Sequence, residues 1–208
     1  MPVHMFRRKK QGVEEQWVTM QEGKLALQWK PVGAELCKAV SAIEKETGEL
    51  QPGYVSEVNL RLAPWLKMLG ERLQHAVVLL IDYGYTRQEY YHPQRTMGTL
   101  SCYYRHQAHE DALQRPGLQN ITASVDFTTV AKAGEKAGFH LLGFNSQANF
   151  LLGCGLEDLI SASDPEDVEQ HMVAMQGVKQ LILPTTMGER FRVIALGKGV
   201  AVQLRGFG

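Results

Sequence analysis

The stretch richest in side chains that could do chemistry is residues 79–106, LLIDYGYTRQEYYHPQRTMGTLSCYYRH. Six of the seven tyrosines of the chain lie in it, namely Tyr83, Tyr85, Tyr90, Tyr91, Tyr103 and Tyr104. Tyrosine offers a rigid apolar face with a hydroxyl handle, so such a cluster can wall a site for a polar planar group. The alternative is an aromatic strand-and-loop core without a ligand.

Asp82 is the first candidate for a chemical role, because it follows the apolar run AVVLLI at 76–81 and precedes Gly84. Ligands of open α/β sheets bind beyond the carboxyl ends of the strands. Tyr83 lies beside Asp82 at the same strand end. In the alternative interpretation, Asp82 caps the next turn and Tyr83 fills a gap in the core.

The loop that follows adds further polar groups. Pro93 restricts its predecessor to extended backbone, which fixes the direction of the segment that carries Arg95. The next candidates along the chain are Thr99, Tyr103, Tyr104 and His106. The alternative for this region is a hairpin with exposed aromatic rings.

Other chemistries have weaker support. His92, His106 and His109 lie near Cys102, but no HxxxH, HExxH or paired-cysteine pattern is present, so no metal site is predicted. No GxSxG elbow indicates a hydrolase. The fragments Gly153-Cys154-Gly155 and Gly197-Lys198-Gly199 are interpreted as turns, and the chain holds no recognisable cofactor loop.

The composition limits the class of protein. With 208 residues, 44% of them apolar, and a formal net charge of zero, the chain is typical of a globular domain and gives no sign of a nucleic-acid partner. Three widely spaced cysteines indicate buried thiols in a reducing compartment, which predicts a cytoplasmic protein. No apolar run approaches the roughly 20 residues that cross a bilayer.

The pattern of apolar residues predicts the elements that position these groups. Residues 16–32 alternate around Glu22-Gly23-Lys24 and predict a β-hairpin. Helical spacing predicts helices over 33–47 and 55–72, and the unbroken run 76–81 predicts a strand buried on both faces, as in parallel sheets.

The second half of the chain continues the α/β order. It predicts strands at 99–105, 140–144 and 190–196 and helices at 126–138, 146–160 and 165–183. Asp126 lies near the expected N-cap of the first of these helices, and Gly138 lies just past its end.

Five motifs in order carry a resemblance to a known family. They are IDYG (81–84), HPQRTMGTLSCYYRH (92–106), NITASVDF (120–127), QANFLLGCGL (147–156) and MGERFRVIALGKG (187–199). In this set the chain resembles the MidA-like class I S-adenosylmethionine-dependent methyltransferases, which include a mitochondrial complex I assembly factor. Relatives tend to show DITAHVDF at the third motif, so Asn120 and Ser124 replace an acid and a histidine.

The resemblance implies an α/β fold: the C-terminal portion of a Rossmann-like class I methyltransferase sheet with added helices and a β-hairpin. The glycine-rich loop and the acidic residue that bind S-adenosylmethionine in the family lie upstream of the residues present. We therefore expect residues 1–208 to be a single partial domain, the substrate-side half, that binds the donor poorly by itself.

The activity implied by the resemblance is methyl transfer to a protein nitrogen, an arginine in the mitochondrial relatives. A guanidinium is always protonated in water, so a carboxylate must hold it. Asp82 is the first candidate for this catalytic carboxylate and Glu57 is the second. The candidates for substrate binding are Tyr83, Arg95, Thr99, Tyr103, Tyr104, His106 and Asp126.

The implied partner is a protein substrate, with a respiratory complex I subunit as one candidate. A non-catalytic interaction module derived from the family is the alternative function. If strands of the sheet are missing, the strand at 76–81 has an exposed edge, and such edges associate. We therefore expect the chain to dimerise or to be poorly soluble.

Overall fold

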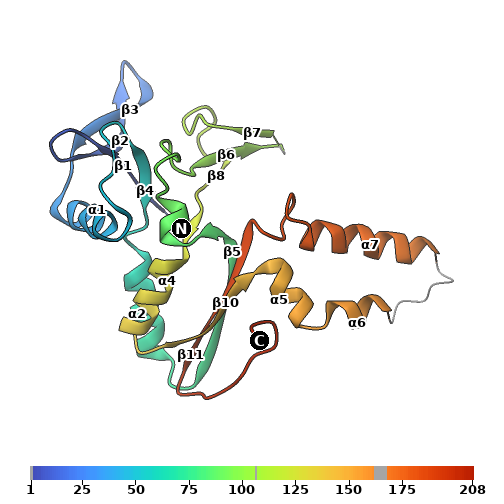
Figure 1. Ribbon diagram of the computed structural model, residues 1–208. Coiled ribbons are helices and arrows are strands. Elements are labelled where there is room, and N and C mark those ends of the chain that lie inside the picture. Colours follow the sequence, from blue (N-terminus) through green and yellow to red (C-terminus); the bar gives the residue numbers. More distant parts are fainter. Residues whose placement is uncertain (1, 106, 162–167) are drawn as a thin grey trace. The chain divides into compact units, whose positions relative to one another are not determined.

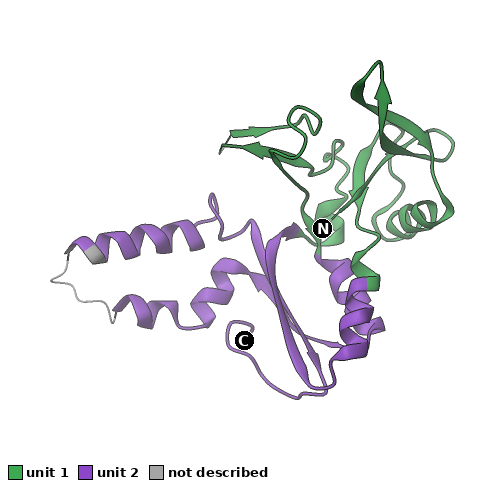
Figure 2. Cartoon of the chain, turned by 180° about the vertical axis from the view of Figure 1, so that it is seen from behind, with its two compact units in different colours: residues 1–64, 85–126 green, residues 65–84, 127–208 purple. Residues whose placement is uncertain are grey.

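The computed structural model describes residues 2–105, 107–161 and 168–208, which form helices and strands in two compact units (Figures 1 and 2). Unit 1 comprises residues 1–64 and 85–126, and unit 2 comprises residues 65–84 and 127–208. The mixture of helices and sheets confirms the α/β class. The prediction of one partial domain over 1–208 stays a prediction.

Unit 1 is built on an antiparallel sheet in the order β3-β2-β1-β4. Its strands are β1 (His4–Arg8), β2 (Val13–Gln21), β3 (Lys24–Pro31) and β4 (Val55–Val58). The hairpin predicted around Glu22-Gly23 is confirmed, because β2 and β3 pair in register from Gln21↔Lys24 to Glu14↔Pro31. Glu22 and Gly23 both have positive φ, of 48° and 76°, as a tight two-residue hairpin turn requires.

Helix α1 (Ala34–Thr47) lays Leu36, Val40 and Ile43 against this sheet, which confirms the helix predicted at 33–47. The core of unit 1 is completed by apolar and aromatic residues from several segments, namely Phe6, Leu50, Tyr54, Tyr90 and Tyr91. Tyr90 and Tyr91 come from the short helix α3 (Arg87–Tyr90) and its C-terminal cap. The aromatic stretch is therefore partly core.

A second, smaller sheet of unit 1 has the order β7-β6-β8. Its strands are β6 (Ser101–Tyr104), β7 (Gln107–His109) and β8 (Asn120–Thr122), and the short strand β9 (Val125–Asp126) ends the unit. The strand predicted at 99–105 is confirmed as β6.

Unit 2 contains the antiparallel strands β10 (His140–Ser146), β11 (Phe191–Lys198) and β5 (Ala76–Tyr85), with β11 in the middle. The strands predicted at 140–144 and 190–196 are confirmed. Val193, Ile194, Ala195 and Leu196 are at most 1% exposed, so β11 is buried on both faces.

Helices flank both faces of this sheet in Figures 1 and 2. α2 (Leu62–Arg72) and α4 (Phe127–Lys136) lie side by side on one face. Gly134 of α4 packs so closely on Leu196 that a Cβ there would lie 2.9 Å from a Leu196 methyl carbon. The other face carries α5 (Gln147–Gly153), which begins at the N-cap Ser146 and packs against α7 (Val168–Ile182).

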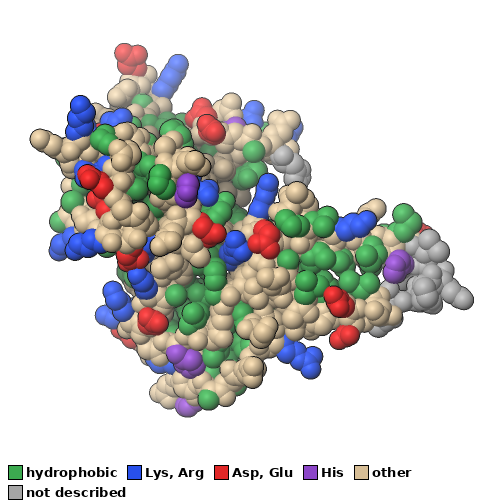
Figure 3. Space-filling model, in the orientation of Figure 1, with side chains coloured by type: hydrophobic (Ala, Val, Ile, Leu, Met, Phe, Trp, Pro, Cys, Tyr) green, Lys and Arg blue, Asp and Glu red, His purple; other side chains and the backbone are tan. Residues whose placement is uncertain are grey.

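α6 (Leu156–Ser161) follows α5 after Cys154-Gly155, so the helix predicted at 146–160 is two helices. Gly155 has a φ of 92°, a left-handed conformation that ends α5. The helix predicted at 165–183 is α7, and its first three predicted residues lie outside the described part of the chain. Figure 3 shows apolar side chains gathered over the α6–α7 region, where Leu159, Met172 and Val173 are exposed.

Two predictions about elements are wrong. Residues 55–58 form β4 instead of the start of a helix, because they pair with β1 from Val55↔Arg7 to Val58↔His4. The strand at 76–81 is not buried on both faces. It runs antiparallel to β11, and in the sheet order β10-β11-β5-β9 its other neighbour is the two-residue strand β9. One face of the strand is uncovered, since Val77, Leu79 and Ile81 are between 41% and 48% exposed.

Candidate functional site

The most unusual polar group of unit 1 is the carboxylate of Glu57. Glu57 lies on β4, where successive side chains point to opposite faces of the sheet, and its exposed fraction is 0%. Ionised side chains are rarely buried to this extent without a counter-charge, because desolvation of the charge is costly. A site that keeps such a group is therefore a candidate for function.

One carboxylate oxygen of Glu57 is held by three donors. Oε1 accepts hydrogen bonds from the Tyr90 hydroxyl at 2.7 Å, from the Thr99 backbone N–H at 2.9 Å and from the Thr99 hydroxyl. The Tyr91 hydroxyl donates to the backbone carbonyl of Glu57 at 3.0 Å. These bonds fix the position and the rotation of the carboxylate.

The donors belong to a wider network. The Thr99 hydroxyl accepts from the backbone N–H of Ser124 at 2.9 Å, and the Tyr90 hydroxyl lies 3.1 Å from the Ser124 carbonyl. Burial, with the negative charge of Glu57, raises the pKa of Tyr90 well above its ordinary value. The Tyr90 hydroxyl therefore stays protonated and remains a donor at every working pH.

The other carboxylate oxygen, Oε2, has no hydrogen-bond partner and no ion-pair partner in the described part of the chain. The backbone of Gly98 lies against it, since a Cβ on Gly98 would be 2.1 Å from Oε2. Gly98 has a φ of 73°, which a residue with a side chain rarely adopts. The structure thus brings Glu57 and Thr99, two predicted site residues, into direct contact.

Asp82 and Tyr83 belong to unit 2, at the end of β5. The Asp82 carboxylate accepts a hydrogen bond from the backbone N–H of Tyr83 at 2.8 Å. Burial raises the pKa of Asp82, and the Tyr83 hydrogen bond opposes this shift. The ring of Tyr83 packs edge-on against Phe191 at 5.6 Å between ring centroids.

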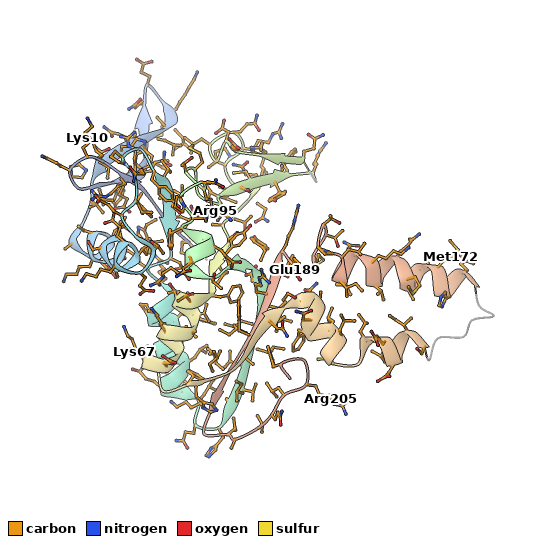
Figure 4. The ribbon with its side chains drawn as sticks, in the orientation of Figure 1. Lys10, Lys67, Arg95, Met172, Glu189 and Arg205 are labelled. Atoms are coloured by element: carbon orange, nitrogen blue, oxygen red, sulfur yellow. The ribbon has the colours of Figure 1, made fainter. Side chains whose placement is uncertain are left out.

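Arg95 lines a shallow pocket of unit 1 together with Tyr85, Glu89, His92 and Gln94. Its guanidinium lies over the Tyr85 ring, 4.1 Å from the centroid, and Nε donates to the Glu89 carbonyl at 3.3 Å. Figure 4 labels Arg95 among the side chains of unit 1. Stacking on Tyr85 therefore fixes the Arg95 side chain, as expected of a residue that lines a pocket.

The remaining predicted residues have mixed positions. Tyr103 is 43% exposed on β6, and the ring of Tyr104 receives the guanidinium of Arg115 at 4.1 Å. Asp126 forms an ion pair with Arg87, with 3.1 Å between Oδ2 and Nε. His106 lies outside the described residues.

Within the described ranges no group of three or more His, Cys, Asp or Glu side chains could hold a metal ion. The prediction of buried thiols is wrong for two of the three cysteines, because Cys37 and Cys154 are exposed and only Cys102 is buried. None of the described helices has the combination of length and apolarity that a membrane crossing needs.

The described residues do not fit the requirements of a nucleoside donor by themselves. In open α/β folds, nucleotide ligands are commonly held where a glycine-rich loop joins a strand to the N-terminus of a helix. In the described segments, Gly153-Cys154-Gly155 instead joins α5 to α6, and the Gly197–Gly199 segment ends β11. We therefore derive no chemical step through a donor bound to these residues.

Sequence reasoning missed Tyr90, Tyr91 and Gly98 as parts of one site. Residues 55–72 were interpreted as a helix, so the alternation of VSEV as a strand was not recognised. Glu57 is the glutamate in this strand. Glu57 and Thr99 were separate candidates, and nothing in the sequence joined them, since the residues that bond Glu57 lie 33 to 42 positions away.

Comparison with known proteins agrees with the resemblance. Residues 1–145 match the family described as "Putative S-adenosyl-L-methionine-dependent methyltransferase". The chain is 28% identical over 206 residues to the mitochondrial protein arginine methyltransferase NDUFAF7 of Danio rerio, which covers 94% of the chain and 44% of the relative. The human protein of the same name is 28% identical over 207 residues and covers 94% and 42%.

Two solved structures from Burkholderia thailandensis cover the whole chain. An uncharacterized protein is 37% identical with a TM-score of 0.93, and the chain covers 55% of its length. A second, described as a "likely methyl transferase" bound to S-adenosyl-homocysteine, is 37% identical with a TM-score of 0.92, and the chain covers 53% of it. The chain thus spans about half the length of the relatives it matches.

The cytoplasmic location predicted from the sequence is wrong by this comparison, because the curated relatives are named as mitochondrial proteins. Cysteine usage reports a redox environment and does not separate the cytoplasm from a reducing organelle.

The α/β order, the sheet of β10, β11 and β5 with helices on both faces, and the added hairpin superpose on the structure that holds S-adenosyl-homocysteine. The chain belongs to the MidA-like family of S-adenosylmethionine-dependent methyltransferases, since the family match covers residues 1–145 of its 208.

Proposed function

We propose that the chain is the substrate-side part of a methyltransferase that moves a methyl group from S-adenosylmethionine to an arginine nitrogen of a protein. The observation that carries this proposal is the superposition of the whole chain, at 37% identity and a TM-score of 0.92, on a structure bound to S-adenosyl-homocysteine. The names of the curated relatives support arginine as the acceptor.

In this proposal the chain holds the acceptor and the upstream half of the relatives holds the donor. A buried or half-buried carboxylate holds the guanidinium, and Asp82 and Glu57 are the two candidates. The candidates for substrate binding are Tyr83, Arg95, Thr99, Tyr103, Tyr104, His106 and Asp126. Orientation of the nitrogen toward the methyl group supplies much of the rate of such a displacement.

The protein substrate is unidentified, and a respiratory complex I subunit is one candidate that the resemblance implies. We also propose that the chain by itself dimerises through the exposed apolar face of β5. Its association is argued below from the exposed side chains of that strand.

A fusion tests the proposed function. The upstream half of the Burkholderia thailandensis protein that binds S-adenosyl-homocysteine is joined to this chain and given S-adenosylmethionine with a set of arginine-containing peptides. We expect methylated peptides by mass spectrometry, and no methylation of the same peptides with lysine in place of arginine. The chain alone is the control and should methylate neither set.

The alternative function is a non-catalytic interaction module. It would be supported if the fusion bound S-adenosylmethionine, captured a protein from an extract, and methylated neither the peptides nor that protein. Micromolar binding of S-adenosylmethionine by the chain alone, measured by calorimetry, would contradict the division of labour between the two halves.

A further inference from the structure

We propose that Oε2 of Glu57, with the backbone of Gly98 beside it, is the point at which the chain binds the guanidinium group of a substrate arginine. The inference rests on the proposed function, because it names the residue that receives the acceptor. It selects Glu57 over Asp82 on the geometry of the carboxylate.

The first argument is the unequal use of the two oxygens of Glu57. Oε1 already accepts from the Tyr90 hydroxyl at 2.7 Å and from the N–H and the hydroxyl of Thr99. Oε2 accepts from none of the described residues. A carboxylate whose only role is to join segments of the core would use both oxygens, since a buried acceptor without a donor costs free energy.

The second argument is charge. The three donors on Oε1 are neutral groups, so none of them supplies a counter-charge to the carboxylate. No basic side chain of the described part of the chain forms an ion pair with Glu57. A cation that reaches Oε2 would supply the missing counter-charge in a site of low dielectric constant, where a charge-assisted hydrogen bond is strong.

The third argument is the residue that covers Oε2. Gly98 occupies this position without a side chain, and a Cβ there would lie 2.1 Å from Oε2 and 3.2 Å from the Cα of Ser56. Its neighbour Met97 is 73% exposed, so this segment separates the carboxylate from the surface. This segment pairs with Val55 of β4, so a ligand from outside reaches Oε2 when the contact of Met97 with Val55 opens.

The shape of this entry favours guanidinium over ammonium. A guanidinium is planar and can present one N–H end-on to a single acceptor oxygen. An ammonium group is compact and more strongly hydrated than a guanidinium, so it loses more hydration on entering a buried site. Glu57 therefore acts as a positioning and specificity residue for arginine against lysine.

The test measures binding by the chain itself, which separates it from the methylation assay. Nα-acetyl-arginine N-methylamide is titrated into the chain and followed by NMR, with the citrulline and lysine analogues as comparison ligands. We expect the amide signals of Gly98 and Thr99 to shift with the arginine analogue alone. We expect Glu57→Gln to weaken that binding by about tenfold or more, as loss of a hydrogen bond to a charged group does.

Glu135→Gln is the matched control, because it removes the same charge from an exposed position on α4 and should bind like the unaltered chain. Equal binding of the arginine and citrulline analogues, or unchanged binding by a folded Glu57→Gln variant, would overturn the inference. So would the absence of any shift at Gly98 and Thr99 in the unaltered chain, a readout that needs no variant.

The two proposals can fail separately. Glu57-dependent arginine binding without peptide methylation by the fusion would leave this site standing and reject the proposed function. If the fusion methylates the peptides and its Glu57→Gln variant binds arginine normally, the proposed function stands and this site is rejected.

Discussion

The Thr99 hydroxyl bonds Glu57 and Ser124 and lies 3.3 Å from the Tyr90 hydroxyl. It donates to Oε1 of Glu57 and accepts from the backbone N–H of Ser124 at 2.9 Å. Thr99→Val keeps the shape of the side chain and removes both bonds. We expect the free energy of unfolding to fall by about 2 kcal/mol, because a part-buried donor is left without a partner.

Urea unfolding followed by circular dichroism measures this loss. Thr96→Val is the control, since Thr96 is exposed and the same chemical change there should stay within about 0.5 kcal/mol. Equal effects of the two substitutions would mean that the Thr99 hydroxyl does not stabilise the network.

The buried tyrosines of unit 1 predict a loss of stability in alkali. Burial raises the pKa of Tyr54 to about 12 from its ordinary value of 10, and the nearby charge of Arg95 opposes the shift. Because the folded-state pKa is the higher one, the stability contributed by the neutral hydroxyl is complete below pH about 10 and is lost as the pH rises to about 12. The difference corresponds to about 3 kcal/mol at most.

We therefore expect the free energy of unfolding to fall between pH about 10 and about 12, and to fall less steeply in Tyr54→Phe. The measurement is a series of urea unfolding curves across this range. Parallel pH profiles for the two proteins would contradict the assignment to Tyr54, and would leave Tyr90 and Tyr91 as the cause, because their pKa values are raised as well.

At the scale of elements, the β2–β3 hairpin depends on its turn. Gly23 has a φ of 76° and open space around its Cα, so an added methyl group would meet no atom within 4 Å and would act through backbone strain alone. We expect Gly23→Ala to destabilise the chain by about 1 kcal/mol, measured by thermal or urea unfolding.

Gly33 provides a matched control. It also has open space around it, but its φ is −71°, which alanine adopts without strain. Gly33→Ala should be neutral or slightly stabilising, because it reduces the entropy of the unfolded chain. If both variants lost equal stability, the turn would not be the cause.

The elements that the sequence predicted best are those whose pattern is local. Alternation on either side of Glu22-Gly23 predicted the hairpin, and Leu36, Val40 and Ile43 predicted α1 with its buried face. Gly138, with a φ of 85°, lies just past α4 as its position suggested.

The elements that depend on pairing were harder to predict. Val55–Val58 is a strand because β1 pairs with it, and β1 lies about 50 residues earlier in the chain. The same limit applies to the site. Glu57 and Thr99 were both candidates, but nothing in the order of residues showed that Gly98 leaves one carboxylate oxygen of Glu57 without a partner.

At the scale of the whole molecule, β5 presents an exposed apolar face. Val77, Leu79 and Ile81 of β5 are 41%, 44% and 48% exposed and lie on one face of the strand. Contiguous exposed apolar patches are typical of surfaces that bind another chain or aggregate. The relatives have additional length, about half of each protein, that could supply a cover.

We therefore expect the isolated chain to self-associate, and Leu79→Lys to reduce the association by placing a charge on the exposed face of β5. Sedimentation or light scattering over a range of concentrations measures the change.

Leu118→Lys is the control, because Leu118 is 72% exposed in unit 1 and its replacement removes a similar apolar side chain far along the sequence from β5. A monomer at all concentrations would show that the exposed face of β5 does not cause association. Equal effects of the two substitutions would assign the association to general surface apolarity. A specific effect of Leu79→Lys that disappears in the fusion with an upstream half would identify β5 as the surface that this half covers.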